Sequence, residues 1–390
     1  MSSRGWRYHN PVRVVSAAGA ASTLGEHIAY RRLALVTTPG FTRRGVVDRI
    51  RASLGERLVE VLDEVKPNPD VRDVDAQAAR LRGLDLDAII ALGGGSSIDS
   101  AKGLARALPL PVDFSLTGHF REGLPLPAGR ALPVVALPTT AGTGAEVTPF
   151  GTLWDFERAK KYSVVGDDLY PAVALLDSEL TLGLPWDVTV SSGLDAVSHA
   201  LESAWNRNAS PISLALCGKS LQLSLSALPR LLEQPDDRDA RGGMLQASLL
   251  AGMAISQTRT ALAHSISYPL TARFGLPHGL ACSFTLPVIA RFNAAADDGR
   301  LHDLARATGF EDMQGLASGL SRLFRRLGVA AMFQEHIPDL SAPGMLLDEM
   351  FTPGRADNNL RDVGSSEIAT LLAEAMDLVA CNYEESGQRA

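Results

Sequence analysis

Cysteine, long apolar runs and excess positive charge are all scarce in this 390-residue chain. The three cysteines, Cys217, Cys282 and Cys381, are far apart in the sequence, which argues against the disulfide framework of small secreted domains. No apolar run reaches the roughly 18–20 residues that a membrane-spanning helix needs, and the first ten residues lack the apolar core of a secretion signal. We therefore expect a cytoplasmic protein that does not associate with membranes.

Positive charge is too sparse for a nucleic-acid-binding surface. The chain has 37 Lys and Arg against 44 Asp and Glu, a formal net charge of −7. Proteins that neutralise many phosphates usually have the opposite balance, so we expect no nucleic-acid partner. The 46% hydrophobic and 21% charged residues are typical of a globular enzyme, and the length suits two domains.

The first half of the chain alternates strand-like with helix-like patterns. Short apolar runs predict buried strands at residues 33–36, 86–92, 132–137 and 173–176. Helical patterns follow in three places: from the turn at Pro39 and Gly40 to about residue 62, over residues 74–81 and over residues 98–108. Continuous apolar runs separated by helices are typical of a parallel sheet that is covered on both faces.

The second half has a different texture. After about Pro185 the strand-like runs disappear and amphipathic helical patterns continue to the C-terminus. Breaks are expected at Pro211, residues 234–238, residues 275–277, Pro338 and Pro343. We predict two domains, an α/β domain over residues 1–183 and an all-α domain over residues 184–390.

A glycine-rich turn lies between the predicted strand at 86–92 and the helix that follows. It runs Gly93, Gly94, Gly95 and Ser96. Glycines let a ligand approach the backbone, and the start of a helix offers free N–H groups to a phosphate. The Gly-x-Gly-x-x-Gly fingerprint of the ordinary Rossmann fold is absent. Taken alone, the turn is equally consistent with a tight connection.

A second candidate turn spans residues 138–148, after the strand at 132–137. Its hydroxyl groups, from Thr139, Thr140, Thr143 and Thr148, suit hydrogen bonds to a ribose or a pyrophosphate. A threonine-rich turn can also simply cap a helix. Two such turns in one α/β domain favour a nucleotide.

Four residues of the second half have the chemistry of a metal site. Asp195 and His199 are four residues apart in a helical pattern, so they project from one face. His264 and His278 follow, separated by prolines and a glycine that interrupt any single helix. Three imidazoles and a carboxylate suit Fe(II), Zn, Mn or Co better than Ca or Mg. The spacing alone is weak support, because such Asp/His pairs are common on ordinary helices.

Together these motifs resemble the iron-containing (group III) alcohol dehydrogenase family, which shares its architecture with dehydroquinate synthase and glycerol dehydrogenase. The matching segments occur in the family's order: residues 66–70, 93–102 and 138–148, Lys161, residues 180–185 and 193–202, His264 and residues 277–279. The resemblance implies a dehydroquinate synthase-like α/β nucleotide-binding domain with a parallel sheet, followed by an all-α metal-binding domain. It implies an NAD(P)-dependent alcohol dehydrogenase or aldehyde reductase, and we expect a homodimer.

The resemblance also assigns roles to residues. The implied dinucleotide contacts are Asn68, Gly94, Gly95, Ser96, Asp99, Thr139, Thr140, Thr143 and Lys161. The implied metal ligands are Asp195, His199, His264 and His278, holding Fe(II), with Zn or Mn as alternatives.

Two departures from the family pattern concern the cofactor and the proton donor. Thr38 occupies the position where many relatives have an acid that binds the adenosine ribose, and Arg43 and Arg44 follow it. Loss of that carboxylate beside two guanidinium groups favours NADPH, with NADH as the alternative. Tyr268 stands where the family often has a histidine assigned to proton transfer, which makes it the candidate catalytic residue. Its hydroxyl group can donate a hydrogen bond, but the side chain could instead simply fill the site, so the route of the proton is open.

A third departure concerns the substrate. Arg259 replaces a small residue, and Arg273 lies before His278. A guanidinium in the substrate pocket needs an anionic partner, so the two arginines predict an anionic aldehyde. The alternative is that Arg259 only pairs with a structural acid. This pattern resembles the phosphonoacetaldehyde reductase branch, which forms 2-hydroxyethylphosphonate in phosphonate biosynthesis. The alternatives are a maleylacetate reductase-like enzyme, a dehydroquinate synthase-like cyclase, and a metal-free binding protein on the same fold.

Overall fold

A computed structural model describes residues 5–158 and 160–387, and these divide into two compact units. The sheet unit contains residues 10–140 and 144–181. The helical unit contains the described residues from 182 onward, together with residues 5–9 and 141–143. The predicted domain limits, 1–183 and 184–390, stay a prediction.

The sheet unit is built on parallel strands. Among the described residues, six of them form one sheet in the order β1-β8-β5-β4-β2-β3. They are β1 (Arg13–Ser16), β2 (Leu33–Val36), β3 (Leu58–Leu62), β4 (Ala88–Gly93), β5 (Val134–Pro138) and β8 (Val173–Leu176). An antiparallel hairpin is formed by β6 (Phe150–Asp155) and β7 (Lys160–Val165). The strands β2, β4, β5 and β8 are buried along their whole length, which explains their unbroken apolar runs.

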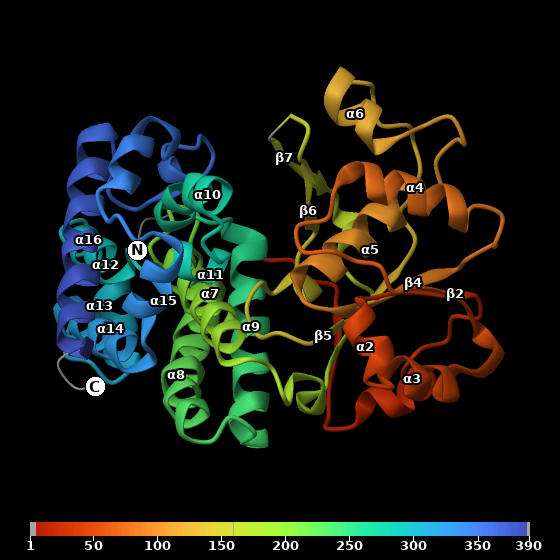
Figure 1. Cartoon of the computed structure of the whole chain (residues 1–390), viewed down its shortest axis with the longest axis horizontal. Coiled ribbons are helices and arrows are strands. Elements are labelled where there is room, and N and C mark those ends of the chain that lie inside the picture. Colours follow the sequence, from red (N-terminus) through yellow and green to blue (C-terminus); the bar gives the residue numbers. More distant parts are fainter. Residues whose placement is uncertain (1–4, 159, 388–390) are drawn as a thin grey trace. The chain divides into compact units, whose positions relative to one another are not determined.

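Helices cover both faces of this sheet, as the apolar patterns predict. Ala34 and Val36 of β2 pack in one apolar cluster with α4 (Val71–Leu81) and α5 (Gly95–Ala107), whereas Leu33 and Leu35 pack in another with α1 (Leu24–His27) and α3 (Val46–Leu54). In Figure 1, α4 and α5 lie on one side of β2 and β4, and α2 and α3 lie on the other. The helices of this unit are α1 (Leu24–His27), α2 (Pro39–Arg43), α3 (Val46–Leu54), α4 (Val71–Leu81), α5 (Gly95–Ala107) and α6 (Leu116–Glu122).

One predicted element is wrong. The helical segment expected to reach about residue 62 ends at Leu54, where Gly55 adopts a positive φ of 59°. The chain then forms β3, which pairs with β2 at the edge of the sheet. The run Leu58, Val59, Glu60, Val61, Leu62 is short and has no clear period, and pairing with β2 decides its conformation.

The helical unit confirms the predicted change of texture. Its helices are α7 (Trp186–Ala204), α8 (Pro211–Glu233), α9 (Arg238–Thr258), α10 (Leu262–Phe274), α11 (His278–Ala281), α12 (Leu286–Ala294), α13 (Arg300–Ala307), α14 (Met313–Leu327), α15 (Val329–His336) and α16 (Ser365–Gly387). Short 3-10 helices complete both units: η1 (Ala20–Thr23), η2 (Gly55–Arg57), η3 (Ala145–Val147), η4 (Asp167–Leu169), η5 (Ser178–Thr181), η6 (Ala342–Glu349) and η7 (Ala356–Asn358). Within the described part of the chain, none of the helices is long and apolar enough to cross a membrane.

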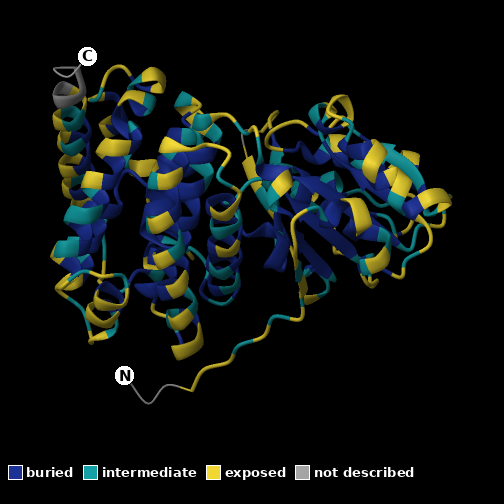
Figure 2. Ribbon diagram, turned by 90° about the horizontal axis from the view of Figure 1, so that it is seen from below, coloured by how far each residue is buried: buried dark blue, intermediate teal, exposed yellow. Residues whose placement is uncertain are grey.

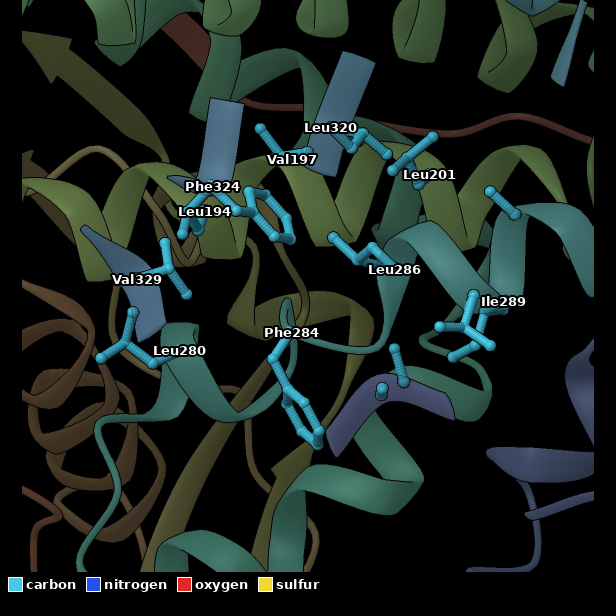
Figure 3. Close-up of a cluster of buried hydrophobic side chains, with 14 of the residues drawn as sticks. Leu194, Val197, Leu201, Leu280, Phe284, Leu286, Ile289, Leu320, Phe324 and Val329 are labelled. Carbon is cyan, nitrogen blue, oxygen red and sulfur yellow. The ribbon is translucent and has the colours of Figure 1, made fainter. Parts of the chain in front are cut away.

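The helix α7 is anchored in the core of the helical unit. Its side chains Leu194, Val197 and Leu201 belong to one buried cluster with residues of α11, α12, α14 and α15 (Figure 3). Burial of each such side chain contributes about 1.5–3 kcal/mol, so this face fixes the rotation of the helix about its axis. Figure 2 shows that residues of both units are buried toward the inside and exposed on the outer surface.

Candidate metal centre and nucleotide site

A second face of α7 carries polar residues that are also buried. Asp195, His199 and Glu202 occupy positions i, i+4 and i+7 of the helix, so they share one face. All three are at most 5% exposed. Buried ionisable groups are costly without compensating partners, so this line of side chains predicts a bound cation or an internal network of charges.

Two more imidazoles reach the same point. The Oδ1 atom of Asp195 lies 3.5 Å from Nε2 of His199, 3.5 Å from Nε2 of His264 and 4.0 Å from Nε2 of His278. Two ligand atoms that each bind a tetrahedral ion at about 2.1 Å lie about 3.4 Å apart. The spacing therefore fits one shared divalent cation, and the structure brings together all four predicted ligands.

A glycine permits the close approach of α11. A Cβ atom on Gly279 would lie only 1.8 Å from the backbone oxygen of Ser191 on α7. Because any side chain at this position would push the two helices apart, glycine is what lets His278, at the start of α11, approach Asp195.

Hydrogen bonds donated by Nδ1 orient two of the imidazoles. The His264 ring lies with Nδ1 at 2.5 Å from Oε2 of Glu202, and the His199 ring lies with Nδ1 at 3.3 Å from the backbone oxygen of Gly142. With the proton on Nδ1, each Nε2 presents a lone pair toward Asp195. The Nε2 atom of His264 is buried and has no hydrogen-bond partner among the described residues. An orphaned acceptor beside a buried carboxylate is what a metal site requires, so these residues fit a divalent metal.

The electrostatics of the cluster also indicate a site for positive charge. Burial alone would raise the pKa of Asp195, but attraction to the imidazoles of His199, His278 and His264 holds that pKa well below its usual range. Burial opposes the charged form of His264, but Glu202 and Asp195 together raise its pKa to about 10. Burial would likewise raise the pKa of Glu202, but the charge and the hydrogen bond of His264 lower it. The two carboxylates thus stay ionised and attract a cation.

A thiol completes the surroundings of Asp195. The Sγ atom of Cys282 donates to Oδ1 of Asp195 over 3.4 Å. Burial raises the pKa of this thiol well above its usual value, so it remains a donor. The potential ligand atoms of Asp195, His264, His278 and Cys282 all lie within 4.8 Å of one another.

Glu202, Gly142 and Cys282 contact the predicted ligands, although no motif in the sequence gives them a role. Glu202 could have been found, because it continues the helical spacing of Asp195 and His199. The spacing of Cys282, four residues after His278, was a second usable signal. Gly142 acts through its backbone oxygen, which leaves no signature in the side-chain sequence.

In the sheet unit, the two predicted nucleotide turns lie side by side. They follow β4 and β5, which are neighbouring parallel strands. The backbone N–H of Thr139 donates to the oxygen of Gly93 over 3.1 Å, and a Cβ on Gly94 would lie 3.0 Å from Oγ1 of Thr140. Gly94 is the N-cap of α5, so Gly95 and Ser96 lie in the first turn, whose N–H groups suit a phosphate.

Further predicted residues gather at the same turns. The backbone N–H of Asn68 donates to Oγ of Ser96 over 3.1 Å, and Asn68 has a positive φ of 57°. Burial raises the pKa of Asp99 to about 6, and the charges of Lys102 and of Lys161 on β7 oppose this shift. Thr143 belongs to the helical unit.

The surroundings of Thr38 contain charges of both signs. Thr38 is the N-cap of α2 and follows β2, the strand beside β4. Arg43 and Arg44 are exposed, and the Arg44 guanidinium lies 4.3 Å from the centre of the Phe41 ring. Asp63 follows β3 and accepts a hydrogen bond of 2.7 Å from Thr42. This carboxylate offsets part of the positive charge that the sequence suggested for a 2′-phosphate.

The predicted catalytic and substrate residues belong to the helical unit. Tyr268 is half-buried on α10, one turn after His264. Arg259 is half-buried at the end of α9, where its backbone has φ 67° and ψ 175°. Arg273 is exposed and forms an ion pair of 3.1 Å with Glu349. Its predicted role in substrate binding stays a prediction.

Comparisons with known proteins show the family of this chain. Residues 11–178 match the family Iron-containing alcohol dehydrogenase, and residues 189–378 match its C-terminal counterpart, the Fe-containing alcohol dehydrogenase family, C-terminal. The chain belongs to the iron-containing alcohol dehydrogenase family. It is an oxidoreductase acting on CH–OH groups, a metal-dependent, NAD(P)-dependent alcohol dehydrogenase or aldehyde reductase.

Similar members of the iron-containing alcohol dehydrogenase family have different substrates in their names. The chain is 37% identical over 283 residues to phosphonoacetaldehyde reductase of Streptomyces viridochromogenes, covering 71% of each chain. It is 33% identical over 301 residues to 1-propanol dehydrogenase PduQ of Salmonella typhimurium, covering 76% of this chain and 77% of the relative. The crystal structure of sulfoacetaldehyde reductase from Bifidobacterium kashiwanohense, in complex with NAD+, has a TM-score of 0.87 at 32% identity. That match covers 96% of this chain and 99% of the other.

Proposed function

We propose that the enzyme reduces a small anionic aldehyde with NAD(P)H, and that phosphonoacetaldehyde, which gives 2-hydroxyethylphosphonate, is its substrate. The observation that carries the proposal is the position of Arg259, in the turn directly before the helix that bears His264. Two of the relatives support it, because their names denote aldehydes that carry a phosphonate or a sulfonate.

The backbone at Arg259 is held in a conformation that is otherwise almost restricted to glycine. Its φ of 67° and ψ of 175° cost on the order of 1–3 kcal/mol for a residue with a side chain. The turn is clamped from both sides: Asn206 donates to the oxygen of Arg259 over 3.2 Å, and Asn358 donates to the oxygen of Thr260 over 3.0 Å. Strain that persists in a clamped turn is typical of a residue placed for function. The guanidinium that this clamped backbone carries can bind a phosphonate through two parallel hydrogen bonds.

The proposed chemistry divides between the chain and its cofactors. When bound, a divalent metal would polarise the aldehyde oxygen, and the reduced nicotinamide would supply hydride to the carbonyl carbon. Asp195, His199, His264 and His278 hold the metal. Arg259 binds the phosphonate group of the substrate and so orients the aldehyde, which lowers the entropic barrier to reaction. Tyr268 donates a proton to the product oxygen through its hydroxyl group.

The identity of the cofactors is also part of the proposal. We propose Fe(II) as the resident metal, with Zn or Mn as alternatives, because the donor set accepts each of them. NADPH is proposed ahead of NADH, because Thr38 brings no carboxylate to the ribose position. The dinucleotide contacts are proposed to be the residues that gather at the turns after β4 and β5, together with Thr143. A homodimer in the cytoplasm is the expected form of the enzyme.

Steady-state kinetics of two Arg259 variants test the substrate proposal. A charge-assisted hydrogen bond contributes about 1.5–3 kcal/mol, so Arg259→Ala should raise KM for phosphonoacetaldehyde about 10- to 150-fold. Arg259→Lys should retain part of the effect, because it keeps the charge but loses the planar fork. KM for propanal should change little in both variants.

The matched control is Arg291→Ala, another half-buried arginine of the helical unit, on α12. It should alter neither KM. If Arg259→Ala affects propanal and phosphonoacetaldehyde equally, the anionic-substrate proposal is wrong.

A further inference from the structure

We propose that Glu202 is a positioning residue of the metal centre, which fixes the ligating form of His264 from the side of the ring away from Asp195. The proposal rests on the proposed metal site, and it extends that site beyond its four ligands to a second buried carboxylate. Glu202 touches His264 rather than the position of the ion.

Both oxygens of Glu202 are committed to hydrogen bonds with the same residue. Its Oε2 atom lies 2.5 Å from Nδ1 of His264, and its Oε1 atom accepts the backbone N–H of His264 over 3.1 Å. Glu202 is 0% exposed, so water does not compete for these contacts. Two simultaneous contacts hold the ring and the start of α10 against α7.

This arrangement determines which ring nitrogen is available to a cation. A neutral imidazole carries its proton on one nitrogen and a lone pair on the other. A carboxylate can only accept, so it requires the proton on Nδ1 and leaves the lone pair on Nε2. That is the nitrogen that lies 3.5 Å from Oδ1 of Asp195.

The same contacts explain why a glutamine at position 202 could not accept both hydrogen bonds from His264. Glutamine has nearly the same shape, but it offers one accepting oxygen and one donating amide. Its two partners on His264, the backbone N–H and the Nδ1–H, are both donors. If the amide group faces the backbone, two donors collide there. If the amide faces Nδ1, the ring proton must move to Nε2, which then cannot bind a metal.

Metal titration of the full-length protein tests the inference. The protein is stripped with a chelator and titrated with Zn²⁺ against a chromophoric competitor, in wild type, Glu202→Gln and Ser220→Ala. Ser220 is a matched buried control, because its Oγ donates to the backbone of Ala247 over 2.8 Å, between α8 and α9. Loss of a partner of this kind typically weakens metal affinity about 10- to 100-fold. We expect that loss in Glu202→Gln and a wild-type Kd in Ser220→Ala.

The outcomes separate the possible failures. If wild type binds no divalent metal, the proposed metal centre itself is wrong. If wild type and Glu202→Gln bind Zn²⁺ equally, only the role of Glu202 is overturned. A lower melting temperature with unchanged Kd would assign Glu202 to the stability of α10 and would also overturn the role.

A measurement on the wild-type protein covers the case in which Glu202→Gln does not fold. In zinc-loaded protein with ¹⁵N-labelled histidine, the nitrogen chemical shifts distinguish protonated from metal-bound ring nitrogens. The signals of His264 are identified by their absence in His264→Gln. The proposal expects a proton on Nδ1 of this residue and metal on its Nε2. Metal on Nδ1 would contradict the proposal.

Discussion

Replacing Arg259 by glycine and by alanine separates the strain of its backbone from the contact of its side chain. Both variants lose the guanidinium, so any interaction of that group is lost equally. They differ in backbone freedom, because φ 67° and ψ 175° are readily accessible only to glycine. The strain relieved is on the order of 1–3 kcal/mol, and the extra freedom of glycine in the unfolded chain costs about 0.4–1 kcal/mol. Arg259→Gly should therefore be about 1 kcal/mol more stable than Arg259→Ala.

Differential scanning calorimetry of the two metal-loaded variants measures this difference. For a unit of this size, about 1 kcal/mol corresponds to a shift of roughly 2–4 °C in Tm. The same pair at Arg273, in the last turn of α10, is a control with the opposite sign. Glycine should be less stable than alanine there, by about 0.5–1 kcal/mol. The reasoning is refuted if alanine is as stable as glycine at position 259, since the backbone would then carry no strain.

Three other perturbations have outcomes that follow from single contacts. Gly279→Ala should lose bound metal, because the new Cβ would lie 1.8 Å from the backbone oxygen of Ser191 and would push α11 away from α7. Elemental analysis measures the bound metal, and stoichiometric metal in this variant would contradict the packing argument. Burial raises the pKa of Glu146 from 4.5 to about 7, so its stabilising proton is fully held below pH 4.5 and lost as pH rises through 7. The free energy of unfolding of wild type should therefore fall between pH 4.5 and about 7 relative to Glu146→Gln, and parallel urea-unfolding profiles would count against this assignment. Thr38→Asp should lower kcat/KM for NADPH and leave kcat/KM for NADH unchanged or higher, because a carboxylate repels a 2′-phosphate; an unchanged ratio would remove Thr38 from the cofactor site.

Much of the sheet unit could be predicted because its strands are buried on both faces. The runs that became β2, β4, β5 and β8 are short and apolar, and helices separate them. The edge strand β3 could not be separated from the preceding helix, because its five residues have no clear period and its pairing with β2 is a tertiary contact. Local pattern therefore predicted the centre of the sheet better than its edge.

The ligands of the candidate metal centre could be predicted from the sequence, but the groups that hydrogen-bond to those ligands could not. Asp195 and His199 share a helical face that spacing reveals, and the ordered resemblance added His264 and His278. Spacing could not show that Glu202 contacts His264, because the two residues are 62 positions apart. The hydrogen bond from His199 to Gly142 involves a backbone oxygen, so no residue type reveals it.

The most direct test of the central claim is aldehyde-dependent oxidation of NADPH by the wild-type protein. It is measured with Fe(II)-loaded and chelator-stripped enzyme, and with phosphonoacetaldehyde and propanal as substrates. We predict a kcat/KM at least about tenfold higher for phosphonoacetaldehyde, lost on chelation and restored by Fe(II), Zn or Mn. Equal kcat/KM for the two aldehydes would contradict the anionic substrate, and full activity in the stripped enzyme would contradict the metal centre.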